Sequence, residues 1–428
     1  MRLLIRGGRV VNPKGRSGQM DILVENGRIA QMGEGIDCEG AATLDAAGLH
    51  LFPGLVDLHC HLREPGYEYK EDIDSGTRAA AKGGFTAVCC MANTRPVTDN
   101  AEEVRYILQR AREAGYCRVY PIGAVSKEMK GEALAEMGDM LSAGAVAFSD
   151  DGRPILDGNL MRQALLYAKS FGALIMAHEE DVSLVYGGVM NESYLSTRLG
   201  LRPNTRAAEE TMIARDCILA QTYDVPVHIC HVSTRGGVEI IRFYKEQGVR
   251  VTCETAPHYI AGCEELVEGY DTHAKVNPPL RAREDREAIR QALAQGVIDC
   301  IATDHAPHHQ DEKQVEFDLA APGISGFESA FALSYTNLVK NGYMALSQLI
   351  QRMSAMPADI VGIPGGVLQP GAVADIAAAD LETPFVLSPK DWVSKGKNNP
   401  FFGQEVYGRV MWTLLEGKAS YRNGEAQI

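Results

Sequence analysis

Hydrophobic and polar positions alternate in two different rhythms along the chain. From residue 54 onward, short apolar runs alternate with longer amphipathic stretches, which is typical of a parallel sheet covered by helices. The runs predicted as strands are residues 55–61, 84–91, 118–125, 144–151, 173–178, 225–231, 249–254 and 297–304. The stretches predicted as helices are residues 71–82, 100–114, 128–142, 157–171, 204–223, 234–247, 283–295 and 326–341. Eight strand–helix units over about 250 residues predict an α/β fold of the TIM type, a (β/α)8 barrel.

Both ends of the chain follow a strand rhythm instead. The N-terminal strands are predicted at residues 3–6, 9–11, 21–24 and 28–32, and Asn26-Gly27 between the last two is a strong hairpin signal. β-like segments return at residues 374–380 and 406–415, followed by a turn at 422–425. We therefore expect residues 54–364 to form the barrel, and residues 1–53 and 365–428 to form one small β-sandwich domain beside it.

Composition narrows the classes of partner and compartment. The net charge of −14 argues against nucleic acid or an anionic membrane as the main partner. The first residues lack the apolar segment of a secretory signal, and no stretch approaches the ~18 consecutive apolar residues of a membrane span. The 10 cysteines form no CxxC pair, and several lie in apolar runs, where a free cysteine packs as a small hydrophobe. A reduced cytoplasm is the expected location.

The first predicted barrel strand ends in a candidate metal site. His59 and His61 are two residues apart, so their side chains lie on one face, about 7 Å apart along the strand. Two imidazoles in this arrangement can converge on one metal ion. Arg63 continues the same parity and offers a cation to an anionic substrate group. Asp57 also shares the parity, and either orients a ligand histidine or forms an ordinary salt bridge.

Other predicted barrel strands also end in potential ligands. Active sites of such barrels lie at the carboxyl ends of the strands. Small residues alternate with bulky ones in 145–151, which points Asp151 inward. His231 ends its strand and is the better ligand there, whereas His228, three residues earlier and on the opposite face, is expected to pack. The residues predicted to gather at the barrel mouth are His59, His61, Asp151, His178, His231 and Asp304. Nitrogen and carboxylate ligands without thiolate favour a catalytic Zn²⁺ or a similar divalent ion.

These motifs resemble those of the amidohydrolase superfamily, and within it the bacterial class I dihydroorotases. The resemblance runs from end to end and rests on Asp57-Leu-His-Cys-His-Leu-Arg-Glu-Pro-Gly66, Met91-Ala-Asn-Thr94, Ser149-Asp-Asp-Gly152, His231-Val-Ser-Thr234, Val276-Asn-Pro-Pro-Leu-Arg281 and Thr303-Asp-His-Ala-Pro-His308. It implies a zinc-dependent interconversion of (S)-dihydroorotate and N-carbamoyl-L-aspartate in pyrimidine (UMP) biosynthesis.

The resemblance also implies the role of each ligand. His59 and His61 bind a first zinc ion, which Asp304 completes, and Asp304 is the catalytic general acid/base. His178 and His231 bind a second zinc ion. Asp151 bridges the two ions, where many members of the superfamily use a carboxylated lysine that this chain lacks at the end of strand four.

The substrate contacts follow from the same resemblance. The residues implied to bind substrate are His61, Arg63, Asn93, Asn277, His308, Pro322 and Gly323. Pro322 departs from the family pattern, which has an aromatic residue there. The nearby run Asp311-Glu312-Lys313 is expected in a mobile loop over the mouth.

Two other functions remain open from the sequence. One is another cyclic amidohydrolase of the allantoinase or hydantoinase type, although those enzymes usually carry the strand-four lysine. The other is a non-catalytic homologue that serves as a scaffold for aspartate transcarbamoylase, although no metal ligand is missing here. A homodimer is expected, and association of an active chain with aspartate transcarbamoylase stays open.

Overall fold

The computed structural model describes residues 2–422 and 425–426, and its centre is a barrel of eight parallel strands. The strands are β6 (Leu55–Cys60), β7 (Phe85–Cys90), β8 (Arg118–Gly123), β9 (Ala147–Phe148), β10 (Ile175–Ala177), β13 (Val227–Ile229), β14 (Val251–Thr255) and β15 (Cys300–Ile301). They pair in chain order from β6 to β15. All eight predicted strands are confirmed, each somewhat shorter than expected.

Contacts between the first and last strands draw the barrel closed. The His61 amide donates to the carbonyl of His305 over 2.8 Å. The Asp57 carboxylate accepts hydrogen bonds from the amide and hydroxyl of Thr303, over 2.7 and 2.6 Å. Asp57 therefore holds the residue before Asp304, a role that neither of its two predicted functions anticipated. Side chains contributed by strands around the barrel fill its interior, among them Leu58, Cys89, Ile122, Ala147, Met176 and Cys300.

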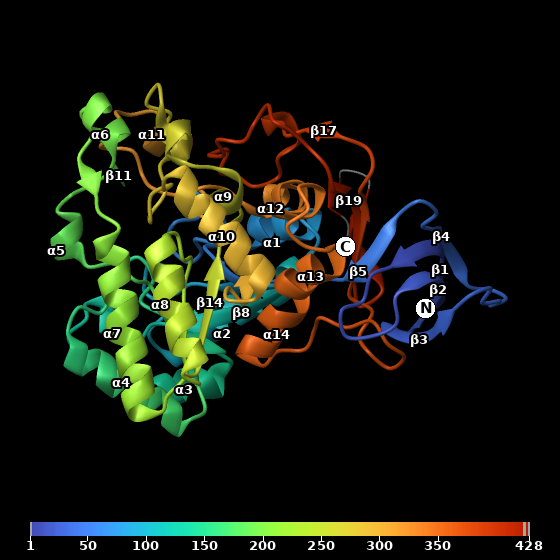
Figure 1. Cartoon of the computed structure of the whole chain (residues 1–428). Helices are drawn as coiled ribbons and strands as arrows, with labels where there is room; N and C mark the ends of the chain where they lie inside the picture. The colour runs from blue at the N-terminus through green and yellow to red at the C-terminus, as the bar shows by residue number, and fades with distance from the viewer. Residues whose placement is uncertain (1, 423–424, 427–428) are drawn as a thin grey trace.

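Helices surround the barrel and follow the predicted rhythm (Figure 1). They are α1 (Ile73–Lys82), α2 (Ala101–Ala114), α3 (Met137–Ala143), α4 (Gly158–Ser170), α7 (Ala207–Tyr223), α8 (Arg235–Glu246), α10 (Arg283–Gln295) and α12 (Phe327–Ser334), which continues as a π-helix through Lys340. Asp72, Asn100 and Asp157 cap α1, α2 and α4 by accepting amide hydrogen bonds from the first turn.

One predicted helix is largely wrong. Residues 128–142 were expected to be helical, but only α3 forms, after a short 3-10 turn at Lys127–Met129. Glu128, Met129 and Gly131 have φ values of 53°, 52° and 67°. Because this left-handed backbone cannot continue a right-handed helix, the helix starts only after it.

The excursions from the barrel were not predicted. Between β10 and α7 the chain forms α5 (Val182–Val185), β11 (Met190–Asn191), α6 (Tyr194–Leu199) and β12 (Pro203–Asn204). Further short helices are α9 (Pro257–Ala261), α11 (Gln310–Lys313), α13 (Leu346–Ile350) and α14 (Met356–Val361). α5, α6 and α11 lie together at one side of the molecule (Figure 1).

Both ends of the chain build the small β-sandwich domain beside the barrel. Its strands are β1 (Arg2–Val10), β2 (Gly18–Glu25), β3 (Arg28–Gly33), β4 (Ala42–Asp45), β5 (His50–Pro53), β16 (Ile376–Asp380), β19 (Arg409–Leu415), β20 (Lys418–Arg422) and β21 (Glu425–Ala426). β16 lies between β5 and β19 in the sheet, so the two termini pair directly. The hairpin at Asn26-Gly27 is confirmed, with φ of 52° and 79°. The turn predicted at 422–425 includes residues 423 and 424, which lie outside the described residues.

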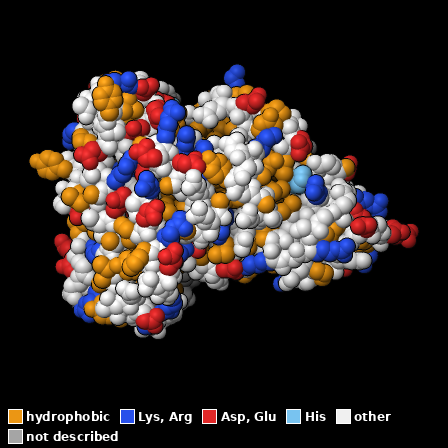
Figure 2. Space-filling view, viewed as in Figure 1, with side chains coloured by type: hydrophobic (Ala, Val, Ile, Leu, Met, Phe, Trp, Pro, Cys, Tyr) orange, Lys and Arg blue, Asp and Glu red, His pale blue; other side chains and the backbone are white. Residues whose placement is uncertain are grey.

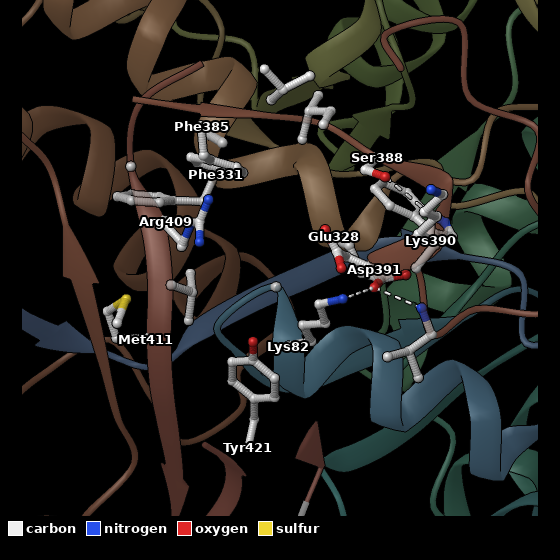
Figure 3. Close-up of a pocket in the computed structure, with 18 residues that line it drawn as sticks. Lys82, Glu328, Phe331, Phe385, Ser388, Lys390, Asp391, Arg409, Met411 and Tyr421 are labelled. Carbon is white, nitrogen blue, oxygen red and sulfur yellow. Dashed lines mark hydrogen bonds and ion pairs between the residues drawn. The ribbon is translucent and has the colours of Figure 1, made fainter. Parts of the chain in front are cut away.

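A cavity of about 620 Å³ lies where the barrel meets the C-terminal segment (Figure 3). Its walls come from α1, α12, β19 and the chain around β17 (Phe385–Val386). Lys82 and Glu328 form an ion pair of 3.0 Å there, and the Arg409 guanidinium lies 4.4 Å from the centre of the Phe385 ring. The cavity contains none of the predicted ligands, so the candidate site lies elsewhere.

The surface carries both signs of charge. On the face in Figure 2, acidic and basic side chains are interspersed. Within residues 2–422 and 425–426, no helix has the length and apolar character needed to cross a membrane.

Candidate metal centre

The histidines that end β6 converge on one carboxylate. His59 and His61 are both buried, and the Nε2 atom of each lies 3.4 Å from an oxygen of Asp151, Oδ1 for His59 and Oδ2 for His61. Asp304 Oδ1, contributed from beyond β15, lies 3.2 Å from Nε2 of His61 and 3.6 Å from Nε2 of His59. The structure therefore brings these four predicted ligands together.

A second group shares the same aspartate. His178 Nδ1 and His231 Nε2 each lie 3.3 Å from Asp151 Oδ1, and these two nitrogens are 2.9 Å apart. Asp151 therefore contacts both pairs of histidines. All the predicted ligands lie at or just beyond the carboxyl ends of barrel strands, which explains how residues distant in sequence meet at one mouth.

The backbone at His231 corrects the predicted strand parity. Alternation alone would direct His231 and His228 to opposite faces, but His231 lies two residues beyond the end of β13 and has a φ of 33°. This left-handed turn directs its side chain to Asp151 although Cys230, its neighbour, also packs in the barrel interior. His228 is not merely packed, because it lies 2.9 Å from the Thr252 hydroxyl and 3.3 Å from Glu254.

The two aspartates after β9 have different surroundings. Asp150 accepts hydrogen bonds from the amides of Val125 and Ser126, over 2.7 and 3.1 Å, and burial raises its pKa to about 6. Asp151 is the one that faces the histidines. The sequence has no lysine between Lys130 and Lys169 that might take its place.

The remaining ring nitrogens of three histidines have partners of their own. His59 Nδ1 lies 2.8 Å from Glu254, His61 Nδ1 lies 2.9 Å from Asn93 Oδ1, and His178 Nε2 lies 3.5 Å from Glu180. Glu254 and Glu180 were missed in the sequence. An acidic residue within the apolar run 249–254 was the available signal for Glu254, and the position two residues after His178 was the signal for Glu180.

The cluster joins buried carboxylates to imidazoles. Burial opposes ionisation of Asp151, but His59 and His178 hold its pKa well below the usual value. Burial likewise opposes ionisation of Asp304, and His61 and His59 lower its pKa. In turn, against the effect of burial, Asp151 raises the pKa of His178 to about 10. A divalent cation can take the place of these imidazole protons, because metal binding and protonation compete for the same nitrogens.

The chemistry of the donors fits zinc. The buried Nε2 atom of His59 has no hydrogen-bond partner within the part of the chain that the structure describes. The ligand atoms of His59, His61 and Asp151, and those of Asp151, His178 and His231, lie within 4.8 Å of one another in each group. Imidazole nitrogens and carboxylate oxygens are the usual donors of catalytic zinc sites.

Most of the predicted substrate contacts lie beside this cluster. Arg63 donates from Nε to the Pro307 carbonyl over 3.1 Å, and its Nη2 lies 3.3 Å from His308 Nε2. That histidine nitrogen lies 2.9 Å from the Pro322 carbonyl. A side chain on Gly323 would meet the Ala306 carbonyl oxygen at 2.7 Å, so only glycine fits this close approach.

Asn93 and Asn277 join the cluster through their neighbours. Asn93 contacts His61, and Asn277 donates from Nδ2 to Glu180 Oε2 over 3.1 Å. Glu180 in turn contacts His178. Asn93 therefore contacts a predicted ligand directly, and Asn277 is linked to one through Glu180. Apart from His61, itself a predicted ligand, the other predicted substrate residues lie around the contact between Arg63 and His308.

Comparison with known proteins decides the family. A family model described as "Dihydro-orotase-like" matches residues 48–237. A dihydroorotase of Pelobacter propionicus is 52% identical over 424 residues, which is 99% of this chain and 100% of the relative. A dihydroorotase of Acetivibrio thermocellus is 51% identical over 421 residues, 98% of this chain and 99% of the relative. The chain belongs to the dihydroorotase family.

Solved structures place this dihydroorotase-family chain in the amidohydrolase superfamily. The L-hydantoinase of Arthrobacter aurescens matches with a TM-score of 0.90 at 25% identity, covering 100% of this chain and 97% of the other. The D-hydantoinase of a Bacillus species matches with a TM-score of 0.88 at 25% identity, covering 99% and 96%. The hydantoinases therefore share the fold, whereas the dihydroorotases are about twice as similar in sequence.

Proposed function

We propose that the chain is a zinc-dependent dihydroorotase, which interconverts (S)-dihydroorotate plus water and N-carbamoyl-L-aspartate in pyrimidine biosynthesis. The observation that carries the proposal is the shared carboxylate of Asp151 between two histidine pairs, with Asp304 and Arg63 beside them. Relatives named dihydroorotase, about half identical over the full chain, support the choice of substrate.

Two zinc ions are the proposed cofactor. His59, His61 and Asp304 would hold one ion, His178 and His231 would hold the other, and Asp151 would bridge them. When bound, such a pair lowers the pKa of water and polarises the substrate carbonyl. Asp151 Oδ1 lies beside His59, His178 and His231, and Oδ2 lies beside His61, so this one carboxylate contacts both histidine pairs, which supports the bridging role.

Asp304 is the proposed proton carrier. Its neighbours His61 and His59 keep its pKa low despite burial, so the carboxylate is ionised and can accept a proton. In the hydrolytic direction, water oxygen bonds to the ring amide carbon and the carbon–nitrogen bond breaks. Asp304 accepts the proton released by that water and delivers it to the departing nitrogen, as general acid/base catalysis requires. The synthetic direction reverses each transfer.

Arg63 and His308 are proposed to bind the substrate carboxylate. They lie 3.3 Å apart beside the cluster, and a guanidinium suits a carboxylate. Asn93 and Asn277 would supply amide hydrogen bonds to the substrate. His61, a proposed ligand of the first zinc ion, would also contact the substrate. Pro322 and Gly323 would contribute main-chain contacts from the loop that packs on His308.

The substrate carboxylate also separates this proposal from the hydantoinase alternative. Hydantoin and allantoin rings lack the carboxylate that Arg63 would bind. The absence of a lysine near Asp151 in the sequence further favours the dihydroorotase type. A non-catalytic scaffold is disfavoured because every predicted ligand is present.

The proposal extends to the oligomeric state of the protein and to its cellular compartment. We propose a homodimer in the cytoplasm, and we propose that the active chain can also associate with aspartate transcarbamoylase. All 10 cysteines are free, and nine of them are buried, which suits a reducing compartment. Size-exclusion chromatography with light scattering, alone and with aspartate transcarbamoylase, tests both assemblies.

Metal analysis beside a turnover assay tests the function. We expect about two zinc ions per chain, and turnover of dihydroorotate far above that of hydantoin or allantoin. Loss of turnover on chelation and recovery with zinc should follow. Preference for a ring without a carboxylate, or turnover by the metal-free protein, would contradict the proposal.

A further inference from the structure

A chain of buried polar groups runs from the metal centre into the barrel. Glu254, on β14, is 1% exposed, and its Oε1 lies 2.8 Å from His59 Nδ1. Its other oxygen lies 3.3 Å from His228 Nε2, and His228 Nδ1 lies 2.9 Å from the Thr252 hydroxyl. The exposed fraction of both histidines is 0%, so water does not compete for these contacts.

These contacts assign the protons of both histidines. A carboxylate only accepts hydrogen bonds, so the ring nitrogens that face Glu254 must donate. When the ring is neutral, His59 therefore keeps its proton on Nδ1, and the lone pair of Nε2 is available to a metal ion. Nε2 is the atom that faces Asp151 and Asp304 at 3.4 and 3.6 Å. His228 likewise donates from Nε2, and its Nδ1 accepts a hydrogen bond from the Thr252 hydroxyl.

We infer that Glu254 is a positioning residue for the metal centre, which fixes His59 as the Nδ1-protonated, Nε2-coordinating tautomer. The inference rests on the zinc-dependent function proposed above. Carboxylates that bind the second nitrogen of a ligand histidine raise its basicity and set its ring orientation. His228, whose other ring nitrogen contacts Thr252, contacts the carboxylate from the other side and restricts its rotation away from His59.

The support for the ligand histidines is unequal. His178 has a longer contact of 3.5 Å, to a Glu180 side chain that is 12% exposed. The Nδ1 atom of His231 has no hydrogen-bond partner among the described residues. Glu254 therefore acts on the ion held by His59, His61 and Asp304, and its removal should weaken that ion more than the one held by His178 and His231.

Glu254→Gln is the test because it keeps the size of the side chain and removes its charge. A carboxamide can accept from one histidine, but its NH₂ group then faces the other. We expect the affinity for one zinc ion to fall about 10- to 100-fold, the usual effect of losing such a partner. The second zinc ion should be retained. Zinc affinity is measured by competition with a chromogenic chelator, which requires no turnover.

Glu71→Gln is the matched control. Glu71 is also 0% exposed and faces a histidine, His305 Nε2, at 3.4 Å, but His305 lies outside both ligand groups. Its substitution should lower stability without changing zinc affinity. A general effect of removing a buried carboxylate would instead change both variants alike.

Nitrogen-15 NMR of the zinc-loaded wild-type protein reports the tautomer of His59 directly, and this measurement does not depend on the folding of any variant. The His59 ring must show its proton on Nδ1, and in Glu254→Gln the Nδ1 proton resonance must shift upfield. A His59 ring protonated on Nε2, or a Glu254→Gln variant with wild-type affinity for both ions, would overturn the inference. A wild-type protein that binds no zinc would instead refute the proposed function itself.

Discussion

At the scale of single residues, Asp304 should carry the proton transfer. Asp304 lies three residues beyond the end of β15, and its carboxylate is 3.2 Å from Nε2 of His61. Asp304→Asn removes the proton acceptor, so turnover should fall by ~10²–10⁴-fold. Asp299→Asn is the control, because Asp299 lies just before the same strand and binds the Cys253 amide at 2.8 Å. Steady-state assays measure turnover of both variants, and circular dichroism checks that they fold. Near-normal turnover of Asp304→Asn would refute its role in proton transfer.

Arg63 should determine which rings bind. Arg63→Met removes the cation beside His308, and losing one member of a buried charge pair costs ~2–5 kcal/mol of binding. Dihydroorotate should therefore bind far more weakly, whereas dihydrouracil, a ring without the carboxylate, should be little affected. The ratio of kcat/KM for the two substrates is the measurement. An equal loss on both would mean that Arg63 serves the fold through its bond to the Pro307 carbonyl.

Asp151 should bridge as a bare carboxylate, without bicarbonate. Asp151→Ala should release the ion of His178 and His231 more readily than the other, which keeps three ligands. Activity should disappear with that ion, because a shared water needs both metals. Zinc stoichiometry after reconstitution, with and without bicarbonate, gives the answer. Bicarbonate-dependent uptake by the wild type would argue for a carbamate, and full zinc content in the variant would argue against the bridge.

The sequence indicated the candidate metal ligands more readily than the residues that contact and orient them. Parallel strands in a barrel end at one mouth, so a histidine or aspartate at each strand end is visible in the sequence. Glu254 lies inside such a strand and resembles any buried acid until its distance to His59 is known. For Asp57 the sequence suggested a partner that the structure does not show. Its parity predicted a contact with a histidine, but its hydrogen-bond partner is Thr303.

At the scale of elements, local backbone conformation decided what periodicity missed. The amphipathic pattern of residues 128–142 is real, but three left-handed residues delay the helix to Met137. The segment between His178 and α7 has short elements with too few residues for a periodic signal. Lys313 was expected in a mobile loop, yet it lies buried at the end of α11.

Lys313 should make stability depend on pH. Its Nζ donates to the carbonyls of Thr272 and Lys275, over 3.0 and 3.2 Å. Burial, and then the nearby Lys275 charge, lower its pKa to about 7 from the 10.5 of an exposed lysine. Above pH 7 the unfolded chain therefore binds more protons than the folded one, and this group's contribution to stability rises with pH through that window.

Comparison of wild type with Lys313→Met isolates this effect. Between pH 7 and 9 the free energy of unfolding of the wild type should gain up to ~1.4 kcal/mol per pH unit relative to the variant. Urea unfolding at several pH values measures the difference, in which other titrating groups cancel. Lys418→Met, at an exposed strand position, should show no such slope. A flat difference for Lys313→Met would mean that its ammonium stays charged in the fold.

At the scale of the whole molecule, the small β domain and the barrel share a core. β16 pairs with β5, which places Ile376 opposite Pro53, two residues before the first barrel strand begins at Leu55. Ala377 and Ala379 of β16 pack in the same hydrophobic cluster as barrel residues, and Phe52 lies 5.0 Å from Phe331 of α12. The predicted division at residues 53 and 364 stays a prediction, and the shared core bears on whether either part folds alone.

We expect that neither part folds alone. Residues 1–364 expressed alone would expose the edge of β5 and the apolar surface that β16 and β19 cover, which favours aggregation. Co-expression with residues 365–428 should restore a soluble complex that binds zinc and turns over dihydroorotate, because the break falls after α14 and before the sheet resumes at β16. The control is a 365–428 fragment carrying Ala378→Asp, which places a charge at a fully buried position of β16 and should fail to rescue. Soluble, zinc-binding and active 1–364 on its own would show that the barrel folds independently of the C-terminal strands.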